Sequence, residues 1–228
     1  MSSQIILASA SPRRKELLAQ IGYDFKVVVS DVDENIEKCE PSQFVAKLSK
    51  RKAMAVADEI LADKVTAGEK SASCIMEMSS DKTIVIGADT VVAIDGEILG
   101  KPVDEEDAVR MLLMLGGKCH SVYTGVTIVK KGVVGGDSGD SAESVDSVET
   151  AETVDSVDSV ETFYDETRVY MYPITEQEAR DYVATGEPMD KAGAYAIQGI
   201  AGKFVERIEG SYNNVVGLPV EKIYQRLK

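Results

Sequence analysis

Short apolar runs rich in β-branched residues alternate along this chain with helical segments that carry their own start and stop signals. Gln4–Ala8 is one such run, and apolar residues at helical spacing follow it over Arg13–Ile21. Ser11 suits the N-cap of that helix, Pro12 its first position and Gly22 the residue after its end. The alternation predicts an α/β fold with helices flanking a sheet.

Periodicity and turn residues place the other elements. Asp95-Gly96 is a hairpin-turn dipeptide, so the sheet is not expected to be purely parallel. Further strands are expected at Tyr23–Val29, Thr83–Ile94, Glu97–Leu99, Val122–Lys130, Phe163–Tyr172 and Lys203–Ile208. Further helices are expected from Pro41 to about Leu61, from Asp104 to Leu115, from Thr175 to about Ala184 and over Pro219–Leu227. The expected fold is therefore α/β with a mixed, twisted sheet.

Two stretches fall outside this pattern. Residues 64–82 are small and polar without a sustained period, which predicts a loop insertion. Within residues 132–162, acids recur at every third position from Asp137 to Glu161, a period that collects no apolar face on a helix or a strand. We interpret this segment as a disordered acidic insertion between two strands, the alternative being a segment that recruits a basic partner. Residues 1–228 are expected to form a single domain of two closely joined lobes.

The charge balance excludes some partners. Lys and Arg total 25 against 39 Asp and Glu, a net charge of −14, which argues against nucleic acid polymers and anionic membranes as partners. Eleven of the acids lie between Lys131 and Arg168, where no basic residue occurs, and without them 28 acids face 25 basic residues. The rest of the molecule is therefore nearly balanced, and a bound polyphosphate is compatible with it.

Cysteine and histidine content limits the chemistry. The three cysteines form no CxxC pair, which favours reduced thiols and a cytoplasmic location. His120 is the sole histidine, so a zinc site built on several histidines is impossible, and no GxSxG motif accompanies it for a serine hydrolase triad. The sequence contains no run of 18 apolar residues and no amino-terminal signal pattern, and it is expected to be neither exported nor embedded.

The segment from Ser9 to Lys15 lies at an expected strand-to-helix junction. Free backbone N–H groups there attract anions, and the side chains of Ser9, Arg13 and Arg14 can hold phosphate oxygens, the two guanidinium groups doing so bidentately. Basic residues in the first turn oppose the helix dipole, a conflict that an anionic ligand would remove. Solvated surface arginines beside an ordinary cap are the alternative.

A lysine and an aspartate stand in apolar surroundings. Lys52 falls on the same helical stripe as Val45, Leu48 and Val56. It is therefore either a ligand-binding residue or a lysine at the edge of the core whose ammonium reaches the solvent. The neighbouring Lys47, Lys50 and Arg51 resemble a solvated face. Asp89 and Thr90 lie between two apolar β runs, where an ionised carboxylate needs a cation, a metal ion or several N–H donors. A turn or capping role for Asp89 stays open. The acidic loop supplies Asp31, Asp33 and Glu34, which could help to hold Mg²⁺.

Two later segments add candidates. Lys101 lies in a constrained loop, Gly100-Lys101-Pro102, after the expected hairpin. The segment Asp190–Gly199 is rich in small residues, which permits close backbone approach, and it contains the carboxamide of Gln198. An amide that donates and accepts together can bind the edge of a nucleobase.

Taken together and in this order, these motifs resemble those of the Maf family of nucleoside triphosphate pyrophosphatases. The resemblance rests on SASPRRKELL, VDEN, SKRKA, IGADTVV, GEILGKP, KAGAYAIQG and GSYNNVVGLP, and it spans nearly the whole chain except residues 64–82 and about 132–162. It implies an α/β fold of the Maf and inosine triphosphate pyrophosphatase type, with two lobes around a cleft. It also implies cleavage between the α- and β-phosphates. SPRR with ADT and IQG is similar to the subgroup that acts on dTTP and UTP, with modified pyrimidine triphosphates as a further substrate class.

Residue roles follow from this resemblance alone. It implies that Asp89 is the proton acceptor and that Lys52, Lys101 and Glu34 complete the catalytic group. Asp89 and Glu34 would hold a divalent cation, Mg²⁺ or Mn²⁺. The substrate-binding residues it implies are Ser9, Arg13, Arg14, Thr90 and Gln198. A second copy of the chain is a further candidate partner, and a non-enzymatic nucleotide-binding regulator linked to cell division is the alternative function.

Overall fold

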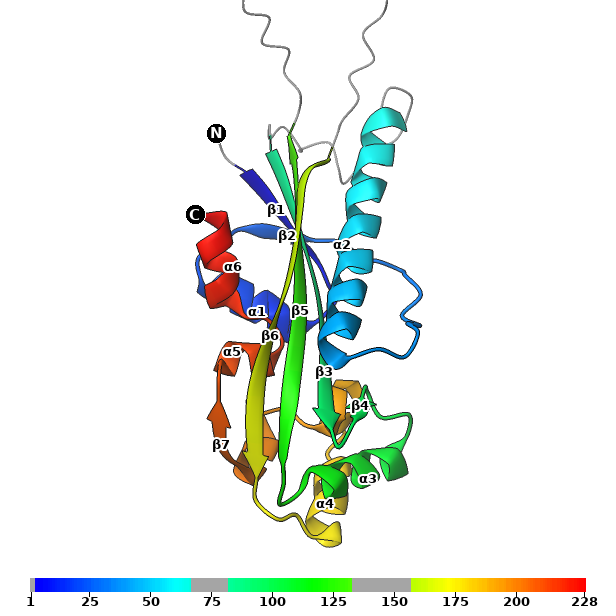
Figure 1. Ribbon diagram of the computed structural model, residues 1–228, viewed down its shortest axis with the longest axis vertical. Helices are drawn as coiled ribbons and strands as arrows, with labels where there is room; N and C mark the ends of the chain where they lie inside the picture. Colours follow the sequence, from blue (N-terminus) through cyan, green and yellow to red (C-terminus); the bar gives the residue numbers. More distant parts are fainter. Residues whose placement is uncertain (1–2, 67–81, 133–156) are drawn as a thin grey trace, which may run out of the picture.

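The computed structural model describes residues 3–66, 82–132 and 157–228, in which strands and helices alternate as the sequence predicts (Figure 1). The strands are β1 (Ser3–Ala8), β2 (Phe25–Val27), β3 (Lys82–Ile94), β4 (Glu97–Leu99), β5 (Cys119–Gly132), β6 (Val157–Met171) and β7 (Val205–Glu209). The α-helices are α1 (Pro12–Gln20), α2 (Pro41–Thr66), α3 (Glu105–Leu115), α4 (Glu176–Val183), α5 (Tyr212–Val216) and α6 (Val220–Leu227). Short 3-10 helices, η1 (Glu187–Asp190), η2 (Ala192–Ala194) and η3 (Ile200–Phe204), lie between α4 and β7.

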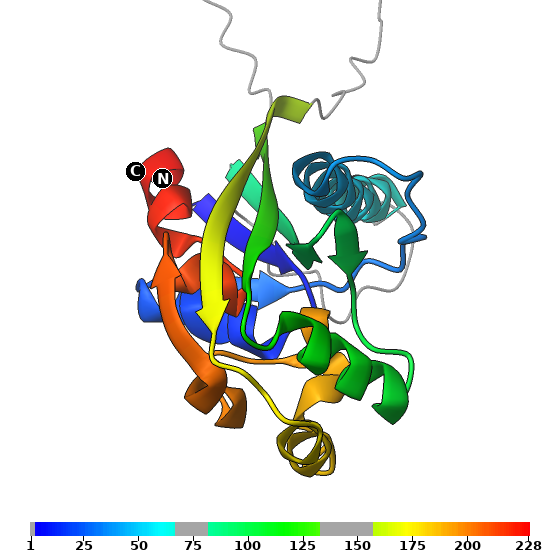
Figure 2. The same cartoon turned by 60° about the horizontal axis from the view of Figure 1, so that its bottom comes forward.

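The strands form a seven-stranded sheet in the order β2-β1-β3-β5-β6-β7, with β4 paired to β3 beside this path. β1 is parallel to both β2 and β3. The other pairs are antiparallel, namely β3 with β4, β3 with β5, β5 with β6, and β6 with β7. Figure 2 shows the strands fanning out as the sheet twists. The predicted α/β class with a mixed, twisted sheet is confirmed.

Helix α2 packs directly on one face of this sheet because two glycines leave room for its backbone. A Cβ at Gly87 of β3 would lie 2.5 Å from the backbone oxygen of Ser49, and one at Gly125 of β5 would lie 2.3 Å from that of Val45. Real Cβ atoms do not approach so closely, so any larger residue would push the helix away. The buried residues of this interface are Ile6, Ala8, Ala53, Val56, Ala57, Ile60, Val85 and Val129. This close packing fixes the distance of α2 from β3, and so the position of the α2 side chains that face the strand.

The opposite face of the sheet carries the remaining apolar core. Helices α1, α5 and α6 lie on the side away from α2 in Figure 1 and pack on strands β1, β3 and β5 through Leu18, Val216 and Ile223. Toward the other end of the sheet, a further buried cluster joins α3 and α4 to Val92 and Val122. The long β5 and β6 strands connect these regions because they pair from Cys119 opposite Tyr170 to Lys131 opposite Val157.

Element boundaries differ from the sequence prediction at both insertions. Helix α2 extends to Thr66, so residues 64–66 are helical, and Lys82 pairs within β3. Strand β6 begins at Val157, so residues 157–162 belong to the sheet and not to the acidic insertion. They pair there because hydrogen bonds to β5 satisfy the backbone without any need for an apolar face. The remainder of the two predicted insertions, residues 67–81 and 133–156, lies outside the described residues.

Helix α2 runs for 26 residues. Neither it nor any other helix in the described part of the chain is both long and apolar enough to cross a membrane.

Candidate active site

An uncovered stretch of one strand edge marks the candidate active site. β1 pairs with β3 as far as Ala8 opposite Gly87, and β4 pairs with β3 again at Val92. β5 occupies the other edge of β3 along nearly its whole length. Within the described strands, residues 88–91 of β3 therefore have no partner on the edge shared by β1 and β4. The carboxyl end of a parallel strand such as β1 is where ligands bind in open α/β sheets.

Asp89 and Thr90 point to opposite faces of the sheet because side chains alternate along a strand. Asp89 contacts Lys52 of α2, whereas Thr90 contacts Arg14 of α1 on the other side. β3 is continuous through both residues, so the turn or capping role left open for Asp89 is wrong. We call the group Lys52, Asp89 and Glu34 the lysine face, and the group Arg14, Ser9, Thr90 and Gly217 the arginine face.

The lysine face holds one ammonium group between two carboxylates. Lys52 Nζ lies 2.8 Å from Asp89 Oδ1 and 2.7 Å from Glu34 Oε1. The side chains of Lys52 and Asp89 are each 13% exposed and that of Glu34 is 63% exposed, so the inward position predicted for Lys52 is confirmed. Partial burial opposes ionisation of Glu34, but the hydrogen bond and charge of Lys52, with Lys101 and Arg14, hold its pKa below the ordinary value. A charged carboxylate thus faces the ammonium at neutral pH.

Arg51 anchors the acidic loop that carries Glu34. Its Nη1 donates to the backbone oxygens of Asp33 and Asn35, on either side of Glu34, the second at 3.1 Å. The Asn35 N–H donates to Asp33 Oδ1 at 2.9 Å, which tightens the turn. Arg51 is exposed, as predicted for a solvated face. It also bonds to the acidic loop, a contact that helical spacing does not reveal.

The arginine face is a dense hydrogen-bond cluster around Arg14. Its Nε donates to Gly217 O at 2.9 Å, its Nη1 to Ala88 O at 2.9 Å and Ser9 Oγ at 3.2 Å, and its Nη2 to Thr90 Oγ1 at 2.9 Å. Burial lowers the pKa of Arg14, and the charge of Asp89 opposes this shift. The guanidinium ties α1 to β3 and to the end of α5, and these contacts use four of its five N–H donors.

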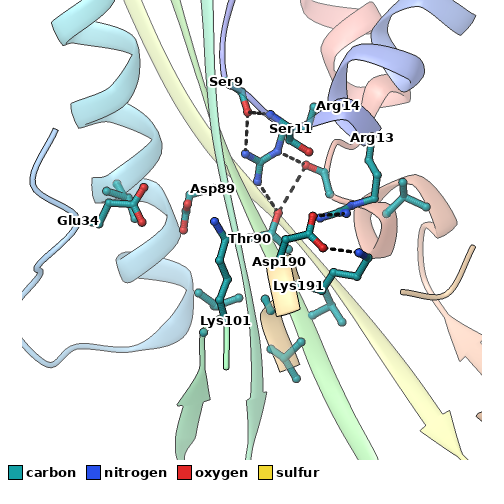
Figure 3. A pocket seen from close by; sticks show the side chains of 18 of the residues that line it. Ser9, Ser11, Arg13, Arg14, Glu34, Asp89, Thr90, Lys101, Asp190 and Lys191 are labelled. Atoms are coloured by element: carbon teal, nitrogen blue, oxygen red, sulfur yellow. Dashed lines mark hydrogen bonds and ion pairs between the residues drawn. The ribbon is translucent and has the colours of Figure 1, made fainter. Parts of the chain in front are cut away.

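Arg13 faces a different partner. Its Nη1 lies 3.2 Å from Asp190 Oδ2, and Lys191 Nζ contacts the same carboxylate while donating to the Glu187 backbone oxygen at 2.7 Å (Figure 3). Partial burial opposes ionisation of Asp190, but Lys191 and Arg13 hold its pKa below the ordinary value. Sequence reasoning marked this segment for its small residues and missed the pair of charges that opens it.

Lys101 and Gln198 complete the set. The Gly193 N–H donates to Gly100 O at 3.0 Å, which joins the loop of Lys101 to the segment of Gln198. Gly193 has φ +67°, and a Cβ there would lie 2.7 Å from Val92, so this approach requires glycine. Figure 3 shows the Lys101 side chain pointing toward the region of Asp89 and Thr90, and it makes no hydrogen bond or ion pair within the described residues. Its ammonium is available to a ligand.

The predicted site residues come together in one pocket of about 750 Å³. Phe44, Ile197 and Val216 form part of its wall, beside several cationic side chains. The pocket therefore suits an anionic ligand that also has an apolar part. The lining includes every residue of the predicted site: Ser9, Arg13, Arg14, Glu34, Lys52, Asp89, Thr90, Lys101 and Gln198.

The donor set fits a metal ion that is shared with a ligand. Among the described residues no cluster of three or more His, Cys, Asp or Glu side chains could hold a metal by itself. Asp89 and Glu34 nevertheless converge on the same ammonium group. Mg²⁺ is commonly bound by one or two carboxylates together with substrate phosphates and water. Two carboxylates in a pocket that also presents several cationic side chains match that pattern.

Comparison with known proteins gives a consistent result. A family model described as Maf-like protein matches residues 4–228. A protein of Agathobacter rectalis named dTTP/UTP pyrophosphatase is 49% identical, over 99% of this chain and 97% of its own length. Proteins of the same name from Geobacillus sp. and Thermoanaerobacter sp. are 42% and 40% identical, over 99% of this chain and 97% and 95% of theirs. The solved Ham1 protein of Staphylococcus aureus, at 13% identity and a TM-score of 0.42 over 99% of this chain and 100% of its own, is too distant to carry a conclusion.

Proposed function

The chain belongs to the family of Maf-like proteins, and from this premise we propose that it hydrolyses dTTP and UTP to the nucleoside monophosphate and pyrophosphate. Relatives 40–49% identical over nearly the whole chain carry the name dTTP/UTP pyrophosphatase. The observation that carries the proposal is the Lys52 ammonium held between Asp89 and Glu34, in a pocket that also presents Arg13 and Lys101.

Cationic side chains bind the triphosphate in this proposal. Lys101 has no hydrogen bond or ion pair to give up within the described residues, although its charge acts on Glu34. Arg13 can exchange the half-exposed Asp190 carboxylate for a phosphate oxygen. Lys52 supplies a further charge beside Asp89. These cationic groups already line one pocket, so they can stabilise the charge that develops on the phosphates once the ligand has replaced the exchangeable partner of Arg13.

Asp89 accepts the proton of the attacking water. The water oxygen attacks the α-phosphorus, the bond from that phosphorus to the α–β bridging oxygen breaks, and pyrophosphate leaves with the electron pair. The water proton passes to a carboxylate oxygen of Asp89, which Lys52 holds in place through Oδ1. The chemistry needs no histidine or cysteine nucleophile, which agrees with a chain in which His120 is buried and bonded to Tyr195.

Asp89 and Glu34 would hold a divalent cation, Mg²⁺ or Mn²⁺, together with phosphate oxygens. When bound, the cation neutralises phosphate charge and favours attack at phosphorus. Lys52 contacts both carboxylates and directs them at one point, which prepares this position before the nucleotide enters.

The base is bound at the other end of the pocket. Gln198 is exposed, lines the pocket and follows the apolar Ile197 in the chain. A carboxamide can accept from the N3–H of uracil or thymine while donating to a ring carbonyl. Arg13 and Thr90 are the further residues that we assign to substrate selection. A cytosine ring presents an acceptor in place of the N3–H, which weakens its fit.

A panel of triphosphates tests the proposal. The full-length protein is incubated with dTTP, UTP, CTP and 7-methyl-GTP in Mg²⁺ or Mn²⁺, and released pyrophosphate is measured. We expect turnover of dTTP and UTP, with the other two nucleotides at least tenfold slower. Folded protein that hydrolyses none of them would overturn the proposal. Tight nucleotide binding without product would then favour the regulator considered from the sequence.

A further inference from the structure

Arg14 has almost no hydrogen-bonding capacity left for a ligand. A guanidinium carries five N–H donors. Four of them are given to Gly217, Ala88, Ser9 and Thr90. A bidentate grip on phosphate needs two neighbouring N–H groups, and just one N–H of Nη2 has no acceptor among the described residues. Arg14 could grip phosphate bidentately only by breaking a contact with the protein.

The Arg14 cluster determines how the Ser9 hydroxyl can bind. Ser9 Oγ accepts from Arg14 Nη1 at 3.2 Å and from the Ser11 N–H at 3.3 Å (Figure 3). A hydroxyl oxygen has two acceptor lone pairs and one proton, so both lone pairs are occupied. The structure gives that proton no acceptor among the described residues, and Ser9 lines the pocket. Ser9 therefore faces the ligand as a donor, which suits an anionic oxygen.

The Thr90 hydroxyl has the opposite polarity. Thr124 Oγ1 donates its proton to the Asn214 backbone oxygen at 3.0 Å. Thr90 Oγ1 lies 2.9 Å from Thr124 Oγ1 and 3.5 Å from Gly217 O, so the Thr90 proton has two acceptors within the protein. Thr90 also accepts from Arg14 Nη2. Its own proton is directed to these protein acceptors, and Thr90 cannot donate to a phosphate.

We propose that Arg14 is a positioning residue and not a phosphate ligand, and that it holds the Ser9 hydroxyl as the hydrogen-bond donor to the phosphate chain. The proposal deepens the function proposed above and rests on it, because it takes the anion to be a triphosphate. Arg13 and Arg14 are adjacent in sequence, yet they act differently. Arg13 meets the ligand through an exchangeable ion pair, whereas Arg14 acts on it through Ser9.

A double-mutant cycle with inorganic tripolyphosphate tests this role. The probe has no base and its binding requires no turnover, and its dissociation constant is measured by calorimetry in the presence of Mg²⁺. We expect Ser9→Ala to weaken binding about tenfold, through the loss of one hydrogen bond to a charged group. Arg14→Lys keeps the charge but not the geometry, and it should also cost about tenfold. The double variant should bind no more weakly than either single variant.

The matched control is the same cycle with Arg13. Arg13→Lys combined with Ser9→Ala should multiply the two effects, because Arg13 and Ser9 reach the phosphates independently. Multiplication in the Arg14 cycle as well would overturn the positioning role while leaving the proposed function intact. Failure of the wild-type protein to bind tripolyphosphate at all would overturn both.

A measurement on the wild-type protein covers the case in which Arg14→Lys does not fold. The arginine side chains are labelled with ¹⁵N, and the Nε–H signals of Arg13 and Arg14 are followed during tripolyphosphate titration. The Arg14 signal should hardly move, because its Nε–H stays bonded to Gly217 O. The Arg13 signal should shift as its ion pair with Asp190 is replaced. An Arg14 shift as large as that of Arg13 would contradict the proposal.

Discussion

On the lysine face of β3, one ammonium group serves two carboxylates, and one of these, Glu34, is mostly exposed. On the arginine face, by contrast, Arg14 gives four N–H donors to fixed protein acceptors and the neighbouring hydroxyls are arranged around it. The first group can exchange partners when a ligand and a metal ion enter. The second group has almost no hydrogen-bond donor that could exchange a protein acceptor for a ligand.

The difference shows how one strand can serve both chemistry and architecture. Alternation along β3 sends Asp89 to the side where contacts can change and Thr90 to the side where they cannot. Changes on the lysine face should therefore appear in the reaction rate. Changes on the arginine face should appear in stability first.

Asp89→Asn should give the largest effect. The amide keeps the shape of the side chain and an oxygen for Lys52, but it cannot accept the proton of water. We expect kcat for dTTP to fall about 10²–10⁴-fold, with the melting temperature within a few degrees of wild type. Lys52→Ala should also remove activity by orders of magnitude.

Asp31→Asn, in the same acidic loop as Glu34, is the control and should stay within about twofold of wild-type kcat. Wild-type turnover by both Asp89→Asn and Lys52→Ala would show that the site is wrongly assigned.

Acid should destabilise the arginine-face side of the sheet. His120 lies two residues before Val122 on β5, is 3% exposed, and bonds through Nε2 to Tyr195 Oη at 2.8 Å. Burial lowers the pKa of His120 to about 4 from 6.5. The unfolded chain therefore takes up the proton first, and the free energy of unfolding should decrease as pH falls from about 6.5 to about 4. The total loss should be about 3 kcal/mol, measured by urea unfolding at several pH values.

The matched variant for this pH effect is His120→Gln, which should show a flatter profile above pH 5. Glu34 acts in a lower window, because its pKa is depressed in the folded state. The stabilisation from its ion pair is present above its ordinary pKa and is lost as pH falls through the lowered value. A wild-type slope between pH 6.5 and 5 that persists in His120→Gln would assign the effect to another group.

Thr124→Val should cost stability with a smaller effect on rate. Thr124 is fully buried and connects Thr90 to the Asn214 backbone oxygen. Valine has the same shape but leaves both partners without their hydrogen bond, which should reduce the free energy of unfolding by about 1–3 kcal/mol. Thr124→Ser keeps the hydroxyl and should lose less, mostly through one missing methyl group. Equal losses in the two variants would mean that packing, and not the hydrogen-bond chain, is what Thr124 supplies.

The fold was predictable where local signals agree with tertiary packing. Ser11, Pro12 and Gly22 mark the limits of α1 within a residue or two, and Thr175 begins a capping box that the structure contains. The start of β6 was not predictable from periodicity. Residues 157–162 carry no apolar alternation, and their strand conformation depends on pairing with β5, which the sequence pattern does not encode.

The candidate site shows the same limit. Helical spacing was enough to direct Lys52 inward, and the pairing of α2 with β3 then brought it to Asp89. Residue type alone made Arg13 and Arg14 look equivalent. Their different partners arise from contacts with Asp190 and Gly217, more than 170 residues away in the chain. Such long-range hydrogen bonds leave no local signal in the sequence.

Arg51→Ala should give the smallest effect, and it tests whether the lysine face depends on a held loop. Arg51 bonds to the backbone oxygens on both sides of Glu34 but is not among the residues that line the pocket. Its loss should raise KM and the Mg²⁺ concentration needed for half-maximal rate by about three- to tenfold, since surface contacts of this kind contribute about 1 kcal/mol. The value of kcat at saturating Mg²⁺ should change little. Lys50→Ala, at an adjacent exposed position of α2, is the control. A fall in kcat without any change in metal dependence would mean that Arg51 does not act by positioning Glu34.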